Sequence, residues 1–204
     1  MTRRHRQHLN PLTMVAMVPR EAPLILPAER QVEVELGCAD ARFCRERAAA
    51  DPESLLVGLD IRGVFLVDAR NALAETALDN VLLEEANFLV DLDRLFPSQS
   101  VARFFINFPD PWFKRRQRNR RWLTDEAVGH LVRALRPGGE IFFQSDVWDL
   151  VLEALAMLEA SDALKNAREP WTFYGDSPFQ ARSTREVICT EDEKQIWWLL
   201  YKKV

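Results

Sequence analysis

The stretch "QVEVELGCADARFCRERAAADPESLLVGLD", residues 31–60, decides the fold. Its first part, "QVEVELG", alternates polar and apolar residues and stops at Gly37, which is the pattern of a strand that runs into a turn. "ARFCRERAAAD" has the composition of a helix that ends before Pro52, and "SLLVGLD" is a short apolar run that ends in a carboxylate. A strand, a helix and a second apolar strand in this order predict two parallel strands joined by a crossover helix.

The same alternation continues to the end of the chain. Further strands are predicted in "NVLLEEAN" (80–87), "VARFFINFPDP" (101–111), "EIFFQSD" (140–146) and "KQIWWLLYKKV" (194–204). Helices are predicted in "VFLVDARNALAETAL" (64–78), in "TDEAVGHLVRALRPGG" (124–139) with an N-cap at Thr124 and a stop at Gly138–Gly139, and in "VWDLVLEALAMLEAS" (147–161). This pattern predicts an α/β fold with a mainly parallel sheet over residues 31–204, preceded by a basic, proline-containing arm at 1–30.

The composition is that of an ordinary globular chain, with 204 residues of which 48% are hydrophobic and 28% charged. No apolar run approaches the ~18–20 residues that a membrane-spanning helix needs. The stretch "MTRRHRQHLNPLTMVAMVP" lacks the apolar core of a signal peptide. The three cysteines form no CxxC pair, so we expect neither a disulfide framework nor a metal site. These features predict a cytoplasmic protein without a membrane partner.

Positive charge is concentrated in two short segments of a chain whose formal net charge is −4. Residues 3–6 and 114–121 hold nine of the 27 lysines and arginines and no acidic residue. The second segment lies in "FPDPWFKRRQRNRR" (108–121), where Pro109 and Pro111 stiffen the loop around Asp110. A stiff acidic tip beside dense positive charge predicts a nucleic-acid site. The side chains expected on its phosphates are Lys114, Arg115, Arg116 and Arg118.

The turn after the first strand has features of a cofactor site. In "ELGCADARF" (35–43), Gly37 lets the backbone approach a ligand, and Asp60 at the end of the next strand can accept hydrogen bonds from ribose hydroxyls. This layout serves NAD enzymes and S-adenosylmethionine (SAM) methyltransferases alike, although Ala39 and Ala41 stand where a GxGxxG fingerprint has glycines. "LRPGG" (135–139), followed by a strand that ends at Asp146, is typical of the methyltransferases.

The stretch that begins "FPDPW" and continues into lysine and arginine resembles the hallmark of the bacterial tRNA (guanine-N7)-methyltransferases, the TrmB family. The likeness runs from about Glu33 to the C-terminus, and "RQHLNPL" (6–12) is similar to an N-terminal stretch of some members. The resemblance implies a Rossmann-like class I SAM-dependent methyltransferase fold whose mainly parallel sheet carries an antiparallel C-terminal strand. It also implies SAM as methyl donor, tRNA as substrate, and no metal or obligate protein partner.

The resemblance also implies roles for individual positions. The catalytic Asp of the family corresponds to Asp110. The family's cofactor-binding positions fall on Glu35, Gly37, Asp60 and Asn87, and Asp110 is expected to contact the cofactor as well. Its substrate-binding positions fall on Lys114, Asp146, Ser183 and Glu186. The chain departs from the family pattern at Ala39 and Ala41 for Gly, Asn87 for Asp, Ser183 for Thr, and Phe113 for a smaller or polar residue.

The chemistry of guanine N7 suits such a site. This nitrogen carries a lone pair and no proton, so its methylation needs in-line placement rather than a general base. Asp110 can accept hydrogen bonds from N1–H and the amino group on the opposite edge of guanine, with Asp146 or Glu186 as a second contact. Two alternatives remain open: a catalytically silent tRNA-binding protein on this scaffold, and a small-molecule methyltransferase that would leave the arginine-rich run without a role.

Overall fold

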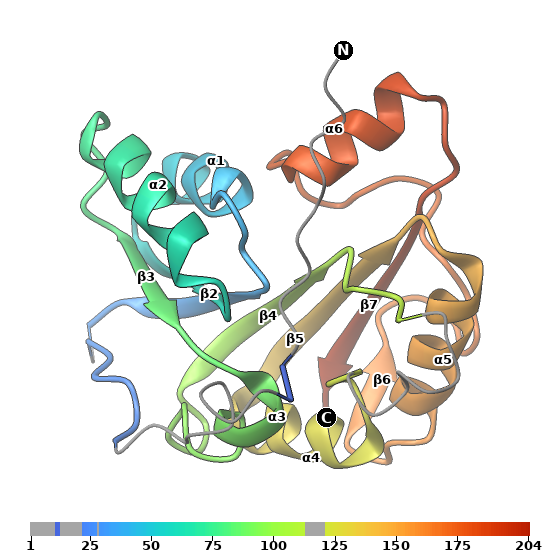
Figure 1. Ribbon diagram of the computed structural model, residues 1–204. Coiled ribbons are helices and arrows are strands. Elements are labelled where there is room, and N and C mark those ends of the chain that lie inside the picture. The colour runs from blue at the N-terminus through green and yellow to red at the C-terminus, as the bar shows by residue number, and fades with distance from the viewer. Residues whose placement is uncertain (1–10, 13–21, 28, 113–120) are drawn as a thin grey trace.

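The computed structural model describes residues 11–12, 22–27, 29–112 and 121–204 (Figure 1). The predicted phosphate contacts Lys114, Arg115, Arg116 and Arg118 lie outside the described residues, as does most of the predicted arm. Within the described part of the arm, Leu24 is buried in the core and its backbone N–H donates to the carbonyl of Leu95, at 3.0 Å. The boundary of the arm at residue 30 stays a prediction.

The described strands form one seven-stranded sheet in the order β3-β2-β1-β4-β5-β7-β6. Their bounds are β1 Gln31–Leu36, β2 Ser54–Asp60, β3 Val81–Glu85, β4 Val101–Asn107, β5 Leu135–Ser145, β6 Leu164–Asn166 and β7 Trp197–Lys203. β1 to β5 pair in parallel, whereas β7 is antiparallel to both β5 and β6. The arrow of β7 accordingly runs opposite to those of β4 and β5 in Figure 1. The predicted mainly parallel sheet with an antiparallel C-terminal strand is confirmed.

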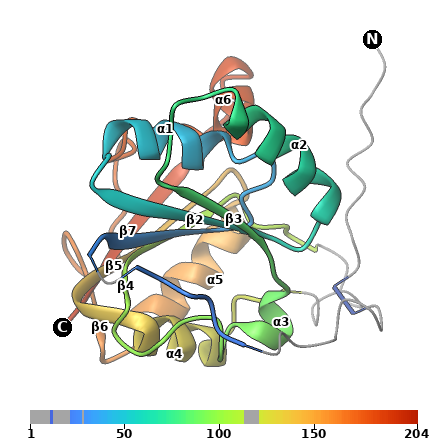
Figure 2. The same ribbon diagram turned by 90° about the vertical axis from the view of Figure 1, so that its left-hand side faces the viewer.

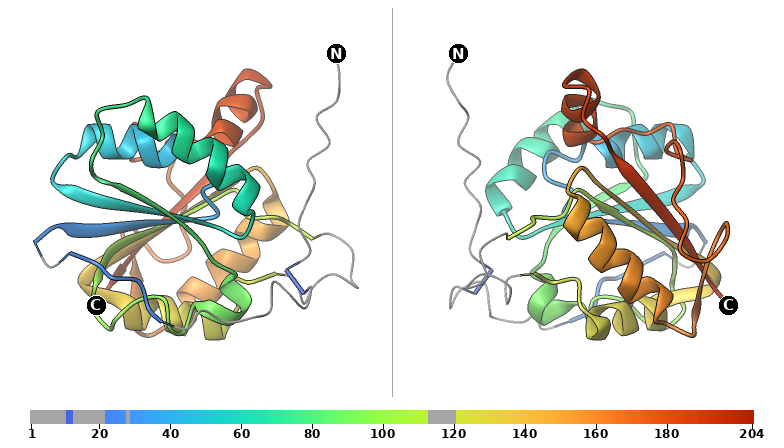
Figure 3. Two further views of the ribbon diagram at one scale, coloured as in Figure 1. Left: turned by 60° about the vertical axis from the view of Figure 1, so that its left-hand side comes forward. Right: turned by 90° about the vertical axis from the view of Figure 1, so that its right-hand side faces the viewer.

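Helices cover both faces of the sheet, and its central strands are buried on both sides. One layer contains α1 (Arg42–Ala50), α2 (Gly63–Ala74) and α6 (Thr184–Glu191), and the other contains α3 (Phe88–Asp91), α4 (Asp125–Ala134) and α5 (Trp148–Glu159) (Figure 2). Figure 3 shows the same two layers from further directions. Phe104 and Ile141 pack toward α4 and α5, whereas Phe105 and Phe142 pack toward α1 and α6.

The end of α4 corrects a prediction. The helix begins as expected, with the hydroxyl of Thr124 accepting from the backbone N–H of Ala127 at 3.2 Å. Its predicted end at Gly138–Gly139 is wrong, because α4 ends at Ala134 and residues 135–139 open β5. Pro137 disfavours helical geometry in the residue before it, and Leu135 pairs with Val101 of β4.

Three short elements were not predicted, namely α3, α6 and β6.

The sheet reverses its direction of growth between β1 and β4, which are neighbours although two other strands separate them in the chain. Open α/β sheets bind their ligands at the carboxyl ends of the strands at such a point. Among the described residues, no helix combines the length and apolarity that would let it cross a membrane.

Candidate active site

A cavity of about 120 Å³ lies at the carboxyl ends of the parallel strands, around the β1–β4 reversal. The predicted site residues that line it are Gly37, Asp60, Asn87 and Asp110. The cavity is smaller than the roughly 300–1,000 Å³ of typical small-molecule pockets, and Pro11 and Arg62 form part of its wall. The sequence therefore predicted four of the residues that line the cavity. It did not predict that Pro11 and Arg62 also form part of the wall.

The turn after β1 has the left-handed backbone of a glycine-rich turn, although alanines occupy two of its three left-handed positions. Gly37 has a φ of 88°, and Ala39 and Ala41 have φ values of 48° and 53°, all in the left-handed region. This region costs a non-glycine residue roughly 1–2 kcal/mol. In return, the backbone N–H of Ala39 donates to Asp60 Oδ2 at 2.9 Å. The turn thus holds two strained alanines beside the carboxylate that ends β2.

Asp60 is buried and bound on both carboxylate oxygens. Arg62 donates from Nε to Oδ1 and from Nη2 to Oδ2, each at 2.9 Å, and its backbone N–H also donates to Oδ1 at 2.9 Å. The Arg62 guanidinium lies over the ring of Phe65, with 4.3 Å from its central carbon to the ring centroid. A ribose can therefore reach the Asp60 oxygens only where this guanidinium moves aside.

Asn87 closes another side of the cavity. Its Oδ1 accepts from the backbone N–H of Leu89 at 3.1 Å and so caps α3. Its Nδ2 donates to the carbonyl of Pro11 at 2.9 Å. The Asn87 amide thus ties a described part of the N-terminal segment to the edge of the cavity.

Asp110 is exposed, and the loop that carries it is fixed at both ends. Phe108 and Trp112 adopt positive φ values of 50° and 42°. The backbone N–H of Phe108 donates to the carbonyl of Gln144 at 2.9 Å, and Arg121 Nε donates to the carbonyl of Pro111 at 2.9 Å. Residues held in such sparsely populated conformations persist only where their surroundings determine them, which is a common property of functional sites.

Glu35 lies in a different environment from the cavity. Its side chain is buried under α1, where Oε1 accepts from Asn107 Nδ2 at 2.8 Å and Oε2 accepts from Cys44 Sγ at 3.0 Å. Burial raises the pKa of Glu35 from 4.5 to about 8, because the charged form loses its hydration. The carboxyl group is absent from the cavity lining, so its predicted contact with the cofactor stays a prediction.

The predicted substrate residues near the C-terminus hold α6 against β5. Asp146 forms an ion pair with Arg185, and the Ser183 hydroxyl caps α6 by accepting from the backbone N–H of Glu186 at 3.2 Å. Glu186 is 1% exposed, pairs with Arg182 and accepts from Gln144 Nε2 at 3.0 Å. None of these three predicted residues lines the cavity, and their predicted contact with a substrate stays a prediction.

Comparison with known proteins places this site in a family. A family model described as "Putative methyltransferase" matches residues 29–199. A tRNA (guanine-N(7)-)-methyltransferase of Synechococcus elongatus is 33% identical, and the match covers 97% of this chain and 95% of the relative. An enzyme of the same name from Prochlorococcus marinus (strain MIT 9303) is 31% identical over 97% of this chain and 87% of its own. This chain belongs to the tRNA (guanine-N(7)-)-methyltransferase family.

Solved structures support the methyltransferase fold of this family member. The 16S rRNA methyltransferase KamB aligns with a TM-score of 0.60 at 17% identity, over 86% of this chain and 89% of its own. The aminoglycoside resistance methyltransferase NpmB1 aligns with a TM-score of 0.56 at 17% identity, over 87% and 89% of the two chains. At these identities the likeness concerns the fold, and it confirms the predicted Rossmann-like class I methyltransferase architecture.

Three residues of this methyltransferase site were missed by sequence reasoning. Arg62 follows the acidic end of β2 by two positions, a spacing at which a side chain can fold back on a carboxylate. Asn107 and Gln144 are amides that directly follow the apolar runs of β4 and β5, and buried amides need partners. That anomaly in the strand pattern was the available signal.

The cysteines and acidic groups of this family member offer no second type of chemistry. Burial raises the pKa of the Cys38 and Cys44 thiols well above the ordinary value, so neither is a ready thiolate nucleophile. In the parts of the chain that the structure describes, no group of three or more His, Cys, Asp and Glu side chains is arranged to hold a metal ion.

Proposed function

We propose that this chain transfers a methyl group from SAM to N7 of a guanine in the variable loop of tRNA. The observation that carries the proposal is the placement of Asp110. This exposed carboxylate lies between two prolines at the carboxyl end of β4, and it lines the same cavity as Gly37 and Asp60. The family of the chain, whose named relatives are tRNA (guanine-N(7)-)-methyltransferases, supports the choice of substrate.

The residues around the cavity fit SAM. Asp60 offers two oxygens to the ribose hydroxyls, and Asn87 with the neighbouring Phe88 offers a polar and an aromatic wall for the adenine. Gly37 leaves open space toward the ligand, since a Cβ added there would have no atom within 4 Å. When bound, SAM supplies a methyl group on a positively charged sulfur. Binding of the ribose to Asp60 requires the Arg62 side chain to leave the carboxylate that it now covers.

Asp110 has the task of orienting the guanine. Its carboxylate accepts hydrogen bonds from guanine N1–H and the exocyclic amino group, which leaves N7 on the opposite edge free to attack. The prolines and the fixed loop ends limit the positions that this carboxylate can take. Orientation of this kind contributes to rate by placing the reacting atoms, with no proton transfer needed at N7.

Binding of the tRNA is assigned to the basic run rather than to Asp110. Lys114, Arg115, Arg116 and Arg118 would contact phosphates and fix the position of the tRNA without reading its sequence. The target guanine would leave its stacked context to enter the cavity, as bases do in other base-modifying enzymes. We further propose that the protein acts in the cytoplasm with tRNA as its partner.

The proposal is tested by methyl transfer from labelled SAM to unmodified tRNA, followed by nucleoside analysis. The expected product is 7-methylguanosine, located in the variable loop by fragment mapping. Tight tRNA binding without any methyl transfer would instead identify a catalytically silent binding protein. Labelling of small molecules with no affinity for tRNA would identify a small-molecule methyltransferase.

A further inference from the structure

A row of buried polar side chains crosses the sheet at the candidate active site, where one member, Asn107, lines the cavity and the other three do not. Glu35 of β1, Asn107 of β4, Gln144 of β5 and Glu186 of α6 form it, and we call it the amide bridge. Asn107 Nδ2 donates to Glu35 Oε1 at 2.8 Å, and Gln144 Nε2 donates to Asn107 Oδ1 at 2.9 Å and to Glu186 Oε2 at 3.0 Å. All four residues are at most 8% exposed.

Trp198 of β7 fixes the direction of every hydrogen bond in the amide bridge. Its indole N–H, which can only donate, lies 2.9 Å from Gln144 Oε1. The Gln144 amide nitrogen must therefore face Asn107 and Glu186. Asn107 then presents its oxygen to Gln144 and its nitrogen to Glu35. The orientation of both amides follows from this one donor, so the row has a single consistent arrangement.

The amide bridge is connected to the loops that carry the predicted catalytic and substrate groups. Asn107 is the last residue of β4 and comes three positions before Asp110. The backbone carbonyl of Gln144 accepts from the N–H of Phe108, the first residue of the Asp110 loop, at 2.9 Å. Asp146 follows Gln144 by two positions and pairs with Arg185 of α6. The side-chain row is thus connected to the bases of both loops and to α6.

Apolar side chains would fill the same space at a lower cost in folding free energy, because each buried polar group needs a hydrogen-bond partner to offset its loss of hydration. A fully matched row, however, fixes the spacing of its members more narrowly than apolar packing does. The presence of two matched amides at the ends of β4 and β5 therefore points to a role in spacing these strand ends.

We propose that Asn107 and Gln144 are positioning residues for methyl transfer. The amide bridge sets the distance between the cofactor turn after β1 and the Asp110 loop after β4. This inference rests on the proposed function for the identity of the acceptor, and on the geometry alone for the role of the row.

The test compares Gln144→Glu with Asn80→Asp, a matched change of a buried amide to an acid. Asn80 donates to the carbonyls of Ala48, Asp51 and Ser54, and it is not among the described residues that line the cavity or form the amide bridge. Single-turnover methylation at saturating SAM and tRNA is measured for both variants from pH 6 to pH 8, as a ratio to the wild type at each pH. Melting temperatures are measured in parallel.

The carboxylate that Gln144→Glu introduces faces only acceptors toward Asn107 and Glu186 when it is ionised, whereas its protonated form can donate to one of them. We expect Gln144→Glu to be at least tenfold slower than the wild type at pH 8 and to recover toward pH 6. Asn80→Asp should stay within about twofold at every pH. The titratable and charged groups near Gln144 are Glu186 and Arg182 by α6, Glu35 of β1 and Cys44 of α1. Dividing each rate by the wild-type rate at the same pH removes the pH dependence that these groups give to both proteins.

Equal ratios for the two variants, or a ratio for Gln144→Glu that does not change with pH, would overturn the positioning role. If either acid variant fails to fold, Gln144→Met and Asn80→Leu replace the pair, with a rate loss expected only in the first. The wild-type product tests the proposed function separately. A product other than 7-methylguanosine overturns that function, whereas the rate ratios with the observed acceptor still decide the role of the amide bridge.

Discussion

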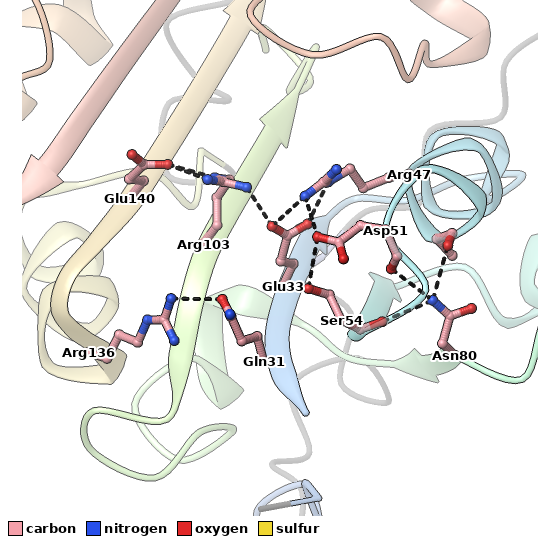
Figure 4. A network of polar contacts seen from close by, with 10 residues as sticks. Gln31, Glu33, Arg47, Asp51, Ser54, Asn80, Arg103, Arg136 and Glu140 are labelled. Atoms are coloured by element: carbon pink, nitrogen blue, oxygen red, sulfur yellow. Dashed lines mark hydrogen bonds and ion pairs between the residues drawn. The ribbon is translucent and has the colours of Figure 1, made fainter. Parts of the chain in front are cut away.

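Glu33 and Glu35 lie two positions apart on β1, both buried and both facing the α1 side of the sheet, yet their surroundings differ. Glu33 lies in a row of charges: it accepts from Arg47 Nε at 2.7 Å and from Arg103, which also binds Glu140 of β5 (Figure 4). Glu35 lies in the amide bridge and accepts from one amide and one thiol. Glu33 is thus bound by positively charged arginines, whereas the buried carboxyl group of Glu35 is hydrogen-bonded by uncharged donors.

Aromatic rings separate the two rows. Phe105 and Phe142 occupy the intervening positions of β4 and β5, and both rings contact Phe179 edge to face, at centroid distances of 5.0 and 5.1 Å. Arg103 lies 4.8 Å over the same Phe179 ring on the charged side. The charged row joins β1, β4 and β5 through residues that do not line the cavity, whereas the amide bridge lies where β4 and β5 lead into the loops at their carboxyl ends. On one face of the sheet, a single layer of aromatic rings therefore lies between the charged row, which we expect to stabilise the fold, and the amide bridge, which we expect to position the loops of the site.

The largest expected effect is on the rate of methyl transfer, and it concerns Asp110, which follows the carboxyl end of β4. Asp110→Asn keeps the shape of the side chain but replaces one acceptor oxygen with a donor, which opposes the guanine donors. Single-turnover methylation should fall by at least ~10²-fold, because an orienting contact fails. The tRNA affinity should stay within a few-fold of normal, since phosphate contacts dominate it. Near-normal turnover would remove Asp110 from the mechanism.

The charged row should show the opposite behaviour. Glu33→Gln leaves Arg47 and Arg103 without a shared carboxylate, although each retains Asp51 or Glu140. We expect the free energy of unfolding in urea to fall by about 2–3 kcal/mol, with the methylation rate of the folded protein within twofold of normal. A rate loss comparable to that of Asp110→Asn would show that the rows are not separate.

The pH dependence of stability should report the burial of Glu35. The pKa of Glu35 is raised from 4.5 to about 8, so between these values the folded protein holds a proton that the unfolded chain releases. This contribution is complete below pH 4.5 and is lost as the pH rises through 8, at about 1.4 kcal/mol per pH unit within the window. Glu35→Gln removes the proton, so its unfolding free energy should decline about 2 kcal/mol less than that of the wild type from pH 5 to pH 6.5. Parallel curves would contradict the raised pKa.

At the cavity itself, Asp60→Ala should weaken SAM binding by about tenfold, measured by calorimetry. Hydrogen bonds to a charged acceptor contribute roughly 1.5–3 kcal/mol. The effect should fall at the lower end of that range, because Arg62 competes for the same oxygens in the free protein. Unchanged SAM affinity in this variant would show that the ribose binds elsewhere.

The smallest effect concerns the strained turn that follows Glu35. Ala39 has a φ of 48°, which glycine adopts without steric cost. Ala39→Gly should therefore raise the free energy of unfolding by about 1 kcal/mol, in contrast to the loss usual for such a change. The control is Ala48→Gly inside α1, which should destabilise. A loss of stability in both variants would show that the turn is not strained at position 39.

The sequence by itself determined the order of the longer strands and helices, the mainly parallel sheet and the edge at which the cavity lies, but not α3, α6 or β6. These features follow from local periodicity and from turn residues, which act over a few positions. The same local signals identified Gly37, Asp60, Asn87 and Asp110, because each lies at or just beyond the end of a strand. The end of α4 was misjudged because a strand pairing and a proline, rather than the glycines, decide it.

Only the tertiary structure decided which side chains meet. The contacts of the amide bridge join residues that are 72, 37 and 54 positions apart in the chain, from Glu35 to Asn107, Asn107 to Gln144 and Gln144 to Trp198. Strand order and register bring them into one row, and a shift of one residue would turn each side chain to the other face. The assignment of Glu33 to arginines and Glu35 to amides has the same origin, because both glutamates have the same local pattern and differ only in what the neighbouring strands and α1 place beside them.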